Sequence, residues 1–279
     1  MGPLVLLLGG LYFGPKSFNS LHIFDTTSSS WWHGSSMQFS RSDFAWGVIE
    51  NRLYVAGGFF DEDIGHIQQV EVYDPDADEW SSLPDMPVHI LIDMYFVHKG
   101  MLYVRGCEPA EKLSDYVLKM LSYNPSSKEW TDEDWMLGTI FKNVGPLTTN
   151  RLIALQEKGD DTLYMLEVKG EPYDYYSGEF PACVKILKLA PDALEWETLF
   201  EKLDVAHRFM ECPCSEAVGT HRDVCFASMG KKVITMGHSQ SDSDYEEKGE
   251  MELHATESNE VLQLSLNCPA NWDAVVVNA

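Results

Sequence analysis

Cysteine and histidine residues gather in one stretch of the chain, where metal binding is the first chemistry to consider. Five side chains that can ligate a metal fall within 19 residues: His207, Cys212, Cys214, His221 and Cys225. Zinc ligands that are close in sequence are usually separated by about two to four residues. A single residue separates Cys212 from Cys214, and Cys225 falls in an expected strand, where a buried thiol is common. We therefore expect structural or loop roles for this cluster, and no bound metal.

A second group of ionisable residues follows the glycine pair Gly57–Gly58. Asp61, Glu62 and Asp63, together with His66, are residue types that can hold a metal or transfer protons. No second half of a catalytic site is visible elsewhere, and the sequence contains no GxSxG, P-loop, HExxH or GxGxxG motif. We expect this segment to be a polar turn, and we predict no catalytic residue and no cofactor.

Arg41 is a candidate for contact with a partner protein. It precedes the apolar run Phe44–Ile49, at an expected junction between structural repeats. A guanidinium there can donate several hydrogen bonds to carboxylates or carbonyls of a partner. The alternative is an ion pair within the chain, which contains 44 acidic residues.

Large aromatic residues in expected loops extend this prediction, because aromatic side chains and arginine dominate protein interfaces. Phe59 and Phe60 directly follow a glycine pair and are the strongest candidates, since a loop has little internal reason to keep two phenylalanines. We predict a partner-binding rim formed by loop residues, namely Arg41, Tyr12 (with Phe13 beside it), Phe59, Phe60 and Trp135.

These loops belong to a phrase that recurs about every fifty residues. An apolar strand ends in a glycine pair, a loop follows, and a second strand ends in an aromatic residue and an acid or amide shortly before a tryptophan. The tryptophans Trp32, Trp80 and Trp130 lie 48 and 50 residues apart. This period is typical of a kelch-type β-propeller, in which each repeat forms one four-stranded blade.

Two weaker copies follow, with insertions expected at 157–181 and 239–257. The fourth copy has Arg151–Leu155, a strand over 184–189 and Trp196, and the fifth has Lys232–Gly237, a strand over 261–264 and Trp272. We predict an all-β fold with five recognisable blades in a single domain over 1–279; a six-bladed ring stays open. The predicted blade copies are roughly 4–36, 37–84, 85–135, 136–200 and 215–279.

The repeated residues are expected to be structural. Glycine permits positive φ and close backbone approach, and each tryptophan is a large apolar plug against the neighbouring blade. The predicted structural residues are Gly9, Gly10, Trp32, Gly57, Gly58, Tyr73, Trp80, Gly106, Tyr123, Trp130, Trp196, Gly237 and Trp272.

The ends of the chain suggest an incomplete first blade. The sequence begins at the second strand of that blade, and nothing ahead of Leu4 supplies an inner strand. The chain ends just after Trp272 in an apolar stretch expected to be an outer strand. We expect a missing N-terminal segment; the alternative is a ring that closes imperfectly.

Composition narrows the class of partner. The net charge of −24 disfavours binding to nucleic acids or anionic membranes, which require lysine and arginine patches. No apolar run reaches 18 residues, and the six cysteines are spread irregularly. A reduced setting, cytoplasmic or nuclear, is therefore expected.

Residues 4–130 resemble the kelch repeats of plant F-box/kelch-repeat proteins. The resemblance rests on the stretches 40–49, 53–58, 70–80 and 83–87. It implies a β-propeller that recruits a protein target to a cullin-based ubiquitin ligase, with an F-box binding the ligase adaptor, and it places Arg41 by the binding rim. No F-box is present in this chain, and residues 131–279 match only loosely.

Two other readings stay open. Some kelch propellers are enzymes, namely oxidases, epimerases or metal-dependent lyases, and fold alone does not decide function. Histidines stand near expected loops but form no convincing constellation: His66, His89, His221 and His238. The eroding repeats also suit a degenerate chain without a stable closed ring.

Overall fold

The structure is a computed structural model in which nearly all regular structure is β-strand. It describes residues 4–10, 17–25, 27–61, 64–109, 117–144, 151–154, 163–170, 182–190, 193–203, 224–229, 232–239, 248–254, 261–266 and 274–277. The chain divides into two compact units, one formed by residues 1–138 with 271–279 and the other by residues 139–270. The single-domain boundaries stay a prediction, and each unit is described by itself.

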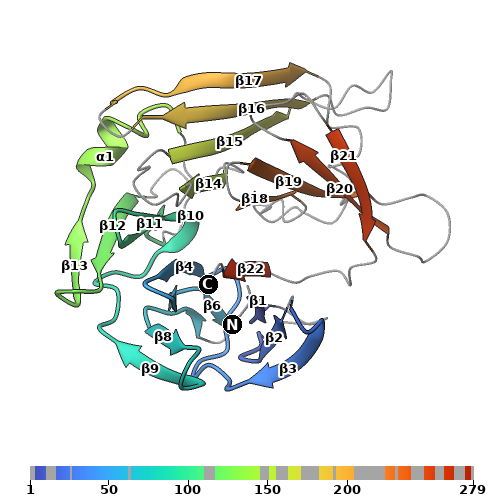
Figure 1. The fold of residues 1–279 in the computed structure, drawn as a ribbon. Helices are drawn as coiled ribbons and strands as arrows, with labels where there is room; N and C mark the ends of the chain where they lie inside the picture. The colour runs from blue at the N-terminus through green and yellow to red at the C-terminus, as the bar shows by residue number, and fades with distance from the viewer. Residues whose placement is uncertain are drawn as a thin grey trace. The chain divides into compact units, whose positions relative to one another are not determined.

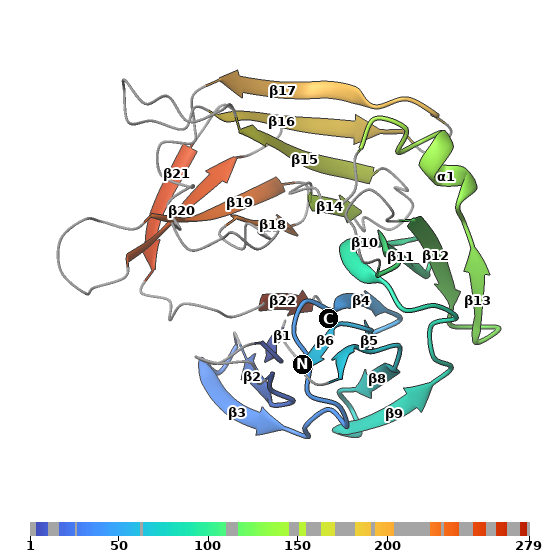
Figure 2. The same cartoon turned by 180° about the vertical axis from the view of Figure 1, so that it is seen from behind.

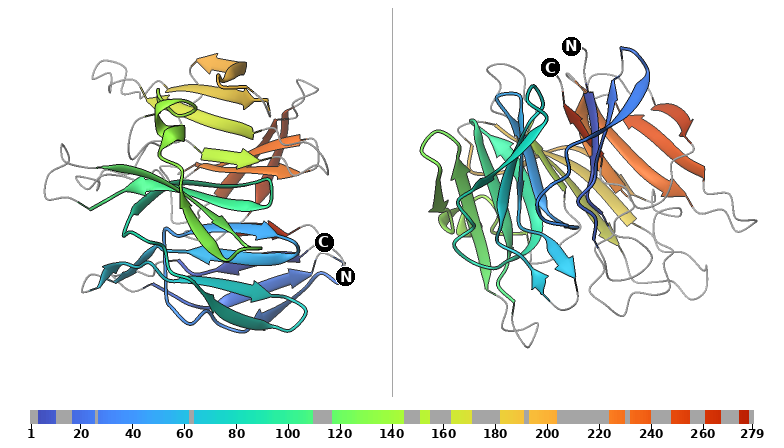
Figure 3. Two further views of the ribbon diagram at one scale, coloured as in Figure 1. Left: turned by 90° about the vertical axis from the view of Figure 1, so that its left-hand side faces the viewer. Right: turned by 90° about the horizontal axis from the view of Figure 1, so that it is seen from below.

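The first unit contains three four-stranded antiparallel sheets (Figure 1). Their strand orders are β22-β1-β2-β3, β4-β5-β8-β9 and β10-β11-β12-β13. A two-stranded hairpin, β6–β7, projects from the second sheet (Figure 3), and a four-residue helix, α1, follows the third. The bounds are β1 (Leu4–Leu8), β2 (Leu21–Asp25), β3 (Ser30–Gly34), β4 (Ala45–Ile49), β5 (Arg52–Ala56), β6 (Phe59–Asp61), β7 (Gly65–His66), β8 (Val70–Asp74), β9 (Glu79–Leu83), β10 (Leu91–His98), β11 (Met101–Cys107), β12 (Leu118–Asn124), β13 (Glu129–Asp132), α1 (Trp135–Gly138) and β22 (Ala274–Val277).

The second unit contains two further four-stranded antiparallel sheets (Figure 2). In both sheets the strands follow one another in chain order. The structure thus confirms the predicted fold class, an all-β chain with five four-stranded propeller blades. The bounds are β14 (Arg151–Ala154), β15 (Leu163–Gly170), β16 (Ala182–Leu189), β17 (Glu197–Leu203), β18 (Val224–Met229), β19 (Lys232–Ser239), β20 (Lys248–His254) and β21 (Val261–Leu266).

The first blade does not lack its inner strand, contrary to the prediction from the sequence. β22 pairs antiparallel with β1, from Leu4 opposite Val277 to Leu7 opposite Ala274. These two strands, from opposite ends of the chain, lie side by side in every view (Figures 1 and 3). The segment expected to be an outer strand of the last blade instead satisfies the backbone hydrogen-bonding groups along the edge of β1, which would otherwise be left unpaired.

The strand assignment in the fourth and fifth blades was also wrong. Both expected insertions contain a strand, β15 in the fourth blade and β20 in the fifth. β14 is therefore the first strand of its sheet rather than the second, and β21 is the fourth strand rather than the third. Neither inserted strand is marked by a glycine pair, which is why the repeat phrase did not identify them.

Strand register shows that Trp31, and not Trp32, occupies the repeat position of the first blade. Phe24 lies opposite Trp31 in the β2–β3 pair, as Tyr73 lies opposite Trp80 in the β8–β9 pair. The two ring pairs have similar centroid distances, 4.8 Å and 5.1 Å. Counting from the glycine pair gave the wrong tryptophan because the β1–β2 connection is one residue shorter, and a shift of one residue moves a side chain to the other face.

The second blade is buried on both faces of its sheet. Leu53, Val55 and Tyr73 belong to one core cluster with apolar residues of the first blade. Tyr54 and Ala56 belong to a second cluster with apolar residues of the third blade. Burial of one such apolar side chain contributes roughly 1.5–3 kcal/mol, so alternate residues of the same strand stabilise two different interfaces.

Repeated tryptophans join successive blades through their indole nitrogens. The Nε1 atom of Trp80 donates to the carbonyl of Ser35 at 2.7 Å, and that of Trp130 donates to the carbonyl of Pro84 at 2.9 Å. In the second unit, Trp196 donates in the same way to Ile140 at 2.9 Å. Ser35 and Pro84 directly follow the last strand of the preceding blade, and Ile140 follows the helix α1. These tryptophans therefore combine packing with a hydrogen bond between repeats.

The glycine pairs lie where the backbone passes between blades. Gly9, Gly10, Gly57 and Gly58 all have positive φ. A Cβ atom at Gly58 would lie 2.6 Å from the carbonyl oxygen of Ser42, and one at Gly106 would lie 2.4 Å from that of Leu91. Gly237 lies in β19, Tyr123 packs on Trp130 at 5.1 Å, and Trp272 lies outside the described residues.

Candidate protein-binding surface

Each blade of the first unit has two distinct ends. Because neighbouring strands are antiparallel, the connections from second to third strand emerge at the same end as the segments that leave the fourth strand. We call this end the loop end; it comprises the β1–β2, β5–β8 and β11–β12 connections and the segments that follow β3, β9 and β13. The short turns between first and second and between third and fourth strands form the opposite, turn end.

Exposed large apolar side chains gather at the loop end. Ile64 is 62% exposed, Trp135 56%, Val117 51% and Phe18 42%, and all four lie in loop-end segments of the three blades. The other two in the described part of this unit, Trp31 and Trp32, lie on β3, so the described turn-end residues contain none. Exposed apolar side chains concentrated on one face are typical of interaction sites.

The β6–β7 hairpin presents Phe59 and Phe60, and neighbouring segments hold it in place. Ser42 and Phe59 exchange two backbone hydrogen bonds, of 2.9 Å and 2.7 Å. The hydroxyl of Ser17, in the connection of the first blade, donates to the carbonyl of Phe60. Both phenylalanines lie in the strand β6 rather than in the predicted loop, and both are half-buried. The exposed apolar residue of the hairpin is Ile64.

His66 lies at the base of this hairpin. Its ring meets the ring of Phe59 edge-on at a centroid distance of 5.5 Å, and its Nδ1 atom is buried without a hydrogen-bond partner. Burial lowers the pKa of His66; the nearby Asp43 carboxylate opposes this shift and His89 adds to it. The imidazole is therefore neutral near pH 7. His89 contacts the carbonyl of His66 through Nδ1 at 3.2 Å.

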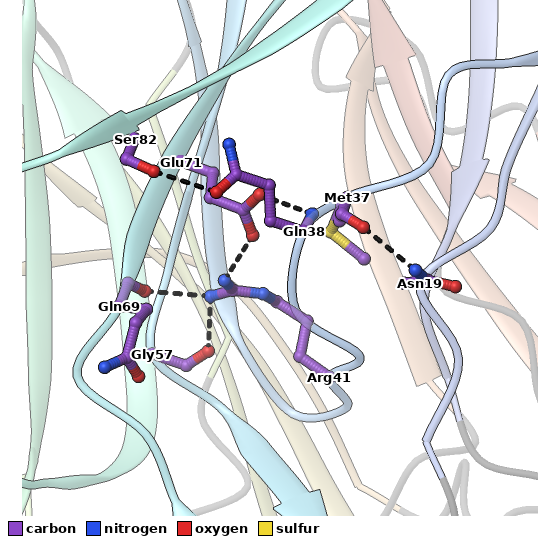
Figure 4. A network of polar contacts seen from close by, with 8 residues as sticks. All are labelled: Asn19, Met37, Gln38, Arg41, Gly57, Gln69, Glu71 and Ser82. Atoms are coloured by element: carbon purple, nitrogen blue, oxygen red, sulfur yellow. Dashed lines mark hydrogen bonds and ion pairs between the residues drawn. The ribbon is translucent and has the colours of Figure 1, made fainter.

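Arg41 does not reach the surface. Its side chain is fully buried, and its Nη2 atom lies 2.6 Å from Oε2 of Glu71, which is also fully buried (Figure 4). Its Nη1 atom donates to the carbonyls of Gly57 at 2.8 Å and Gln69 at 2.9 Å. Burial lowers the pKa of Arg41 and Glu71 opposes this shift. The structure therefore shows the alternative considered from the sequence, an ion pair within the chain, and places Arg41 beneath the rim.

The third blade replaces this ion pair with two apolar residues. Met37 and Met86 occupy equivalent positions, because their amides donate to the carbonyls of Asn19 and Gln68. Ala45 and Met94 are likewise equivalent by strand register. By this alignment, the position of Arg41 is held by Ile90 and that of Glu71 by Leu121. Ile90 is 0% exposed and Leu121 is 2% exposed, and both belong to one core cluster.

A different buried ion pair stands elsewhere in the third blade. Arg105 binds Asp93 through two hydrogen bonds, from Nε to Oδ1 at 2.9 Å and from Nη2 to Oδ2 at 2.8 Å. Asp93 lies at a register shift between β10 and β11. The sequence analysis missed this pair, because Arg105 replaces a small residue within the strand and its partner precedes it on the adjacent strand.

The remaining predicted rim residues divide between the described and undescribed parts of the chain. Trp135 is exposed at the start of α1, where its Nε1 atom donates to Glu133. Tyr12, Phe13 and residues 207–223 of the cysteine and histidine cluster lie outside the described residues. The sequence analysis missed Phe18, Ile64 and Val117, whose signal was their place beside the loops that it had singled out.

The described residues offer neither a metal-ligand group nor a membrane-spanning helix. They contain no group of three or more histidine, cysteine, aspartate or glutamate side chains placed to hold a metal ion. None of the helices among them is both long enough and apolar enough to span a membrane.

Comparisons with known proteins agree with this architecture. Residues 40–87 match the model of the kelch motif. A stretch of 151 residues is 32% identical to the F-box/kelch-repeat protein At1g16250 of Arabidopsis thaliana and covers 53% of this chain and 36% of the relative. A stretch of 87 residues is 40% identical to At1g22040, also an F-box/kelch-repeat protein of Arabidopsis thaliana, covering 28% of this chain and 18% of the relative.

An animal relative shows that the similarity extends beyond plants. Kelch-like protein 36 of Bos taurus is 25% identical over 136 residues, which cover 47% of this chain and 22% of the relative. The matched stretches span well under two thirds of these relatives. With five four-stranded blades and a kelch motif at 40–87, the chain is a kelch-type β-propeller that resembles F-box/kelch-repeat proteins over part of its length.

Proposed function

We propose that this chain is a non-catalytic propeller that binds a protein target through the loop end of its first unit. The supporting observation is the gathering of Phe18, Ile64, Val117 and Trp135, all exposed, on loop-end segments of three successive blades. Aromatic and large apolar side chains are the usual anchors of protein interfaces. The half-buried Phe59 and Phe60 enlarge the apolar surface around Ile64.

Several features of this surface favour binding over catalysis. Arg41, which lies in the segment between β3 and β4, is occupied by Glu71 and backbone carbonyls. His66 is neutral and packed against Phe59. These groups hold loops in place, whereas acid–base catalysis requires titratable groups directed toward a shared substrate position.

We also propose what happens to the target after it is bound. The resemblance to F-box/kelch-repeat proteins supports substrate recognition for a cullin-based ubiquitin ligase. In this role the propeller selects the target, and an F-box would contact the ligase adaptor. The target would then be turned over in a manner that depends on cullin activity.

Capture from an extract of the cells that make the protein tests this proposal. We would immobilise the native chain, the double variant Phe18→Ser/Ile64→Ser and the control Leu194→Ser, and quantify bound proteins by mass spectrometry. Leu194 is a matched control, since it is 62% exposed, as Ile64 is, but belongs to the second unit. We expect a target that the native chain and the control retain and the double variant loses at least about fivefold.

Equal capture by all three chains would contradict the proposed surface. The ligase role has its own readout, the half-life of the captured target when cullin activation is blocked. A longer half-life is expected, and an unchanged half-life would leave a binding propeller without the ligase role.

A further inference from the structure

The loop end around the β6–β7 hairpin is acidic as well as apolar. Asp61 lies in the hairpin, and Asp43 follows Ser42, which pairs with Phe59 of the hairpin. Asp85 precedes Met86, whose amide donates to the carbonyl of Gln68 in the β5–β8 connection. Among the described residues of the β5–β8 connection and of the segments between β3 and β4 and between β9 and β10, Arg41 is the one lysine or arginine. It is fully buried against Glu71 and therefore presents no positive charge to a partner.

We infer that the occupant of this surface is a basic peptide segment with an apolar anchor residue. This inference rests on the proposed protein-binding function and adds the chemistry of the partner. Ile64 and Phe18 offer exposed apolar contact, and carboxylates in and around the hairpin, such as Asp61, attract lysine and arginine. An acidic segment would be repelled by the same carboxylates, since complementary potentials select partners and like charges exclude them.

Hydrogen bonds hold the described strands of the hairpin in place. Ser42 and Ser17 contact its first strand, and the Ile67 amide donates to the Gly58 carbonyl at 2.9 Å. The carboxylate of Asp61 accepts a hydrogen bond from the amide of Ile64 at 2.8 Å, which links β6 to the residue before β7. Preorganised loops lose less conformational entropy on binding, so apolar and charged contacts translate more fully into affinity.

Selection from random linear peptides displayed on phage tests the inference with the full chain as bait. Enriched peptides would be synthesised and their affinities measured for the native chain and for Ile64→Ser, Asp61→Asn, Asp85→Asn and Asp76→Asn. Asparagine at 61 keeps an oxygen that can accept the Ile64 amide. Asp76 is an exposed aspartate at the turn end and serves as the charge control.

We expect enriched peptides to carry lysine or arginine beside an apolar residue. Binding should weaken at least about fivefold in Ile64→Ser and about threefold in Asp61→Asn and Asp85→Asn, and stay unchanged in Asp76→Asn. The effect of the aspartate substitutions should shrink as salt is raised from about 0.15 M to about 1 M, because the Debye length falls from about 8 Å to about 3 Å.

Other results separate the two proposals. Acidic or neutral peptides that depend on Ile64 but not on Asp61 or Asp85 would overturn the basic partner and leave the protein-binding surface standing. Peptides that bind Ile64→Ser as well as the native chain would overturn both, and so would a selection without enrichment over bare support.

Discussion

At the scale of single residues, one buried position is occupied in two chemically different ways within the same chain. The second blade places Arg41 against Glu71, and the third places Ile90 and Leu121 at the equivalent positions. A buried ion pair is often no more stabilising than apolar residues of similar size, but removal of one partner leaves an uncompensated charge. The two residues of each pair should therefore be exchangeable only together, because either one alone would leave a buried charge or a mismatched neighbour.

This relation predicts the outcome of a substitution cycle. Arg41→Ile alone should lower the free energy of unfolding by about 3–5 kcal/mol, because it leaves Glu71 charged and buried. The double variant Arg41→Ile/Glu71→Leu should recover most of this loss, since it reproduces the pair found in the third blade. Denaturant unfolding would measure both, and a double variant as unstable as Arg41→Ile would contradict the equivalence.

His66 gives a prediction for the dependence of stability on pH. Burial lowers its pKa in the folded chain below the value of about 6.5 expected in the unfolded chain. The unfolded chain therefore binds the proton more readily, so the contribution of His66 is complete above about pH 6.5 and is lost as the pH falls through the folded pKa.

Thermal unfolding between about pH 8 and pH 5 would detect this loss. His66→Gln should flatten the fall in melting temperature over that range. His22, whose pKa is also lowered, first by burial and then by His33, provides the comparison variant His22→Gln. A native chain whose melting temperature is unchanged over this range would contradict the assignment.

At the scale of elements, the first blade depends on a strand from the other end of the sequence. β22 forms four register pairs with β1 and covers its edge. An uncovered edge strand exposes unpaired amide and carbonyl groups and promotes association with other chains.

Removal of β22 should therefore destabilise the first blade. A chain that ends at residue 273 should lose at least about 2 kcal/mol of unfolding free energy, because the backbone hydrogen bonds between β1 and β22 contribute about 1 kcal/mol each. It should also form higher oligomers in light scattering. Unchanged stability and a monodisperse shortened chain would show that the β1–β22 pairing contributes little.

The sequence was informative about elements wherever the repeat phrase was intact. The glycine pairs and the hydrophobic alternation predicted the second and third blades. It was not informative where a strand lacked a glycine marker, as in β15 and β20, or paired with the opposite end of the chain, as in β22. Such pairings depend on tertiary contacts, which a local phrase does not encode.

For the candidate surface, the sequence predicted the loops better than the orientation of their side chains. Phe59, Phe60 and Trp135 lie at the loop end as predicted from their position after strands, and Trp135 is exposed. Arg41 occupies the expected junction but points inward to Glu71. A residue type suited to binding a partner is equally suited to binding its own chain, and only the burial of its side chain separates the two.

At the scale of the whole molecule, we expect a partner to bind at one end of the blades of the first unit. Three successive blades of the first unit place exposed apolar residues at the loop end, and the acidic surroundings of the β6–β7 hairpin favour a basic segment there. Among the described residues, the short turns at the turn end carry no exposed large apolar side chain, and Trp31 and Trp32 are exposed along β3. Binding should therefore be confined to one end of the blades.

Site-specific photo-crosslinking tests this claim most directly. A photoreactive amino acid would replace Ile64 at the loop end or, in a matched chain, Asp76 at the turn end, in the cells that make the protein. The account predicts a discrete crosslinked protein at position 64, absent at position 76 and lost when Phe18→Ser is added. A crosslink at position 76 with none at position 64 would contradict the central claim.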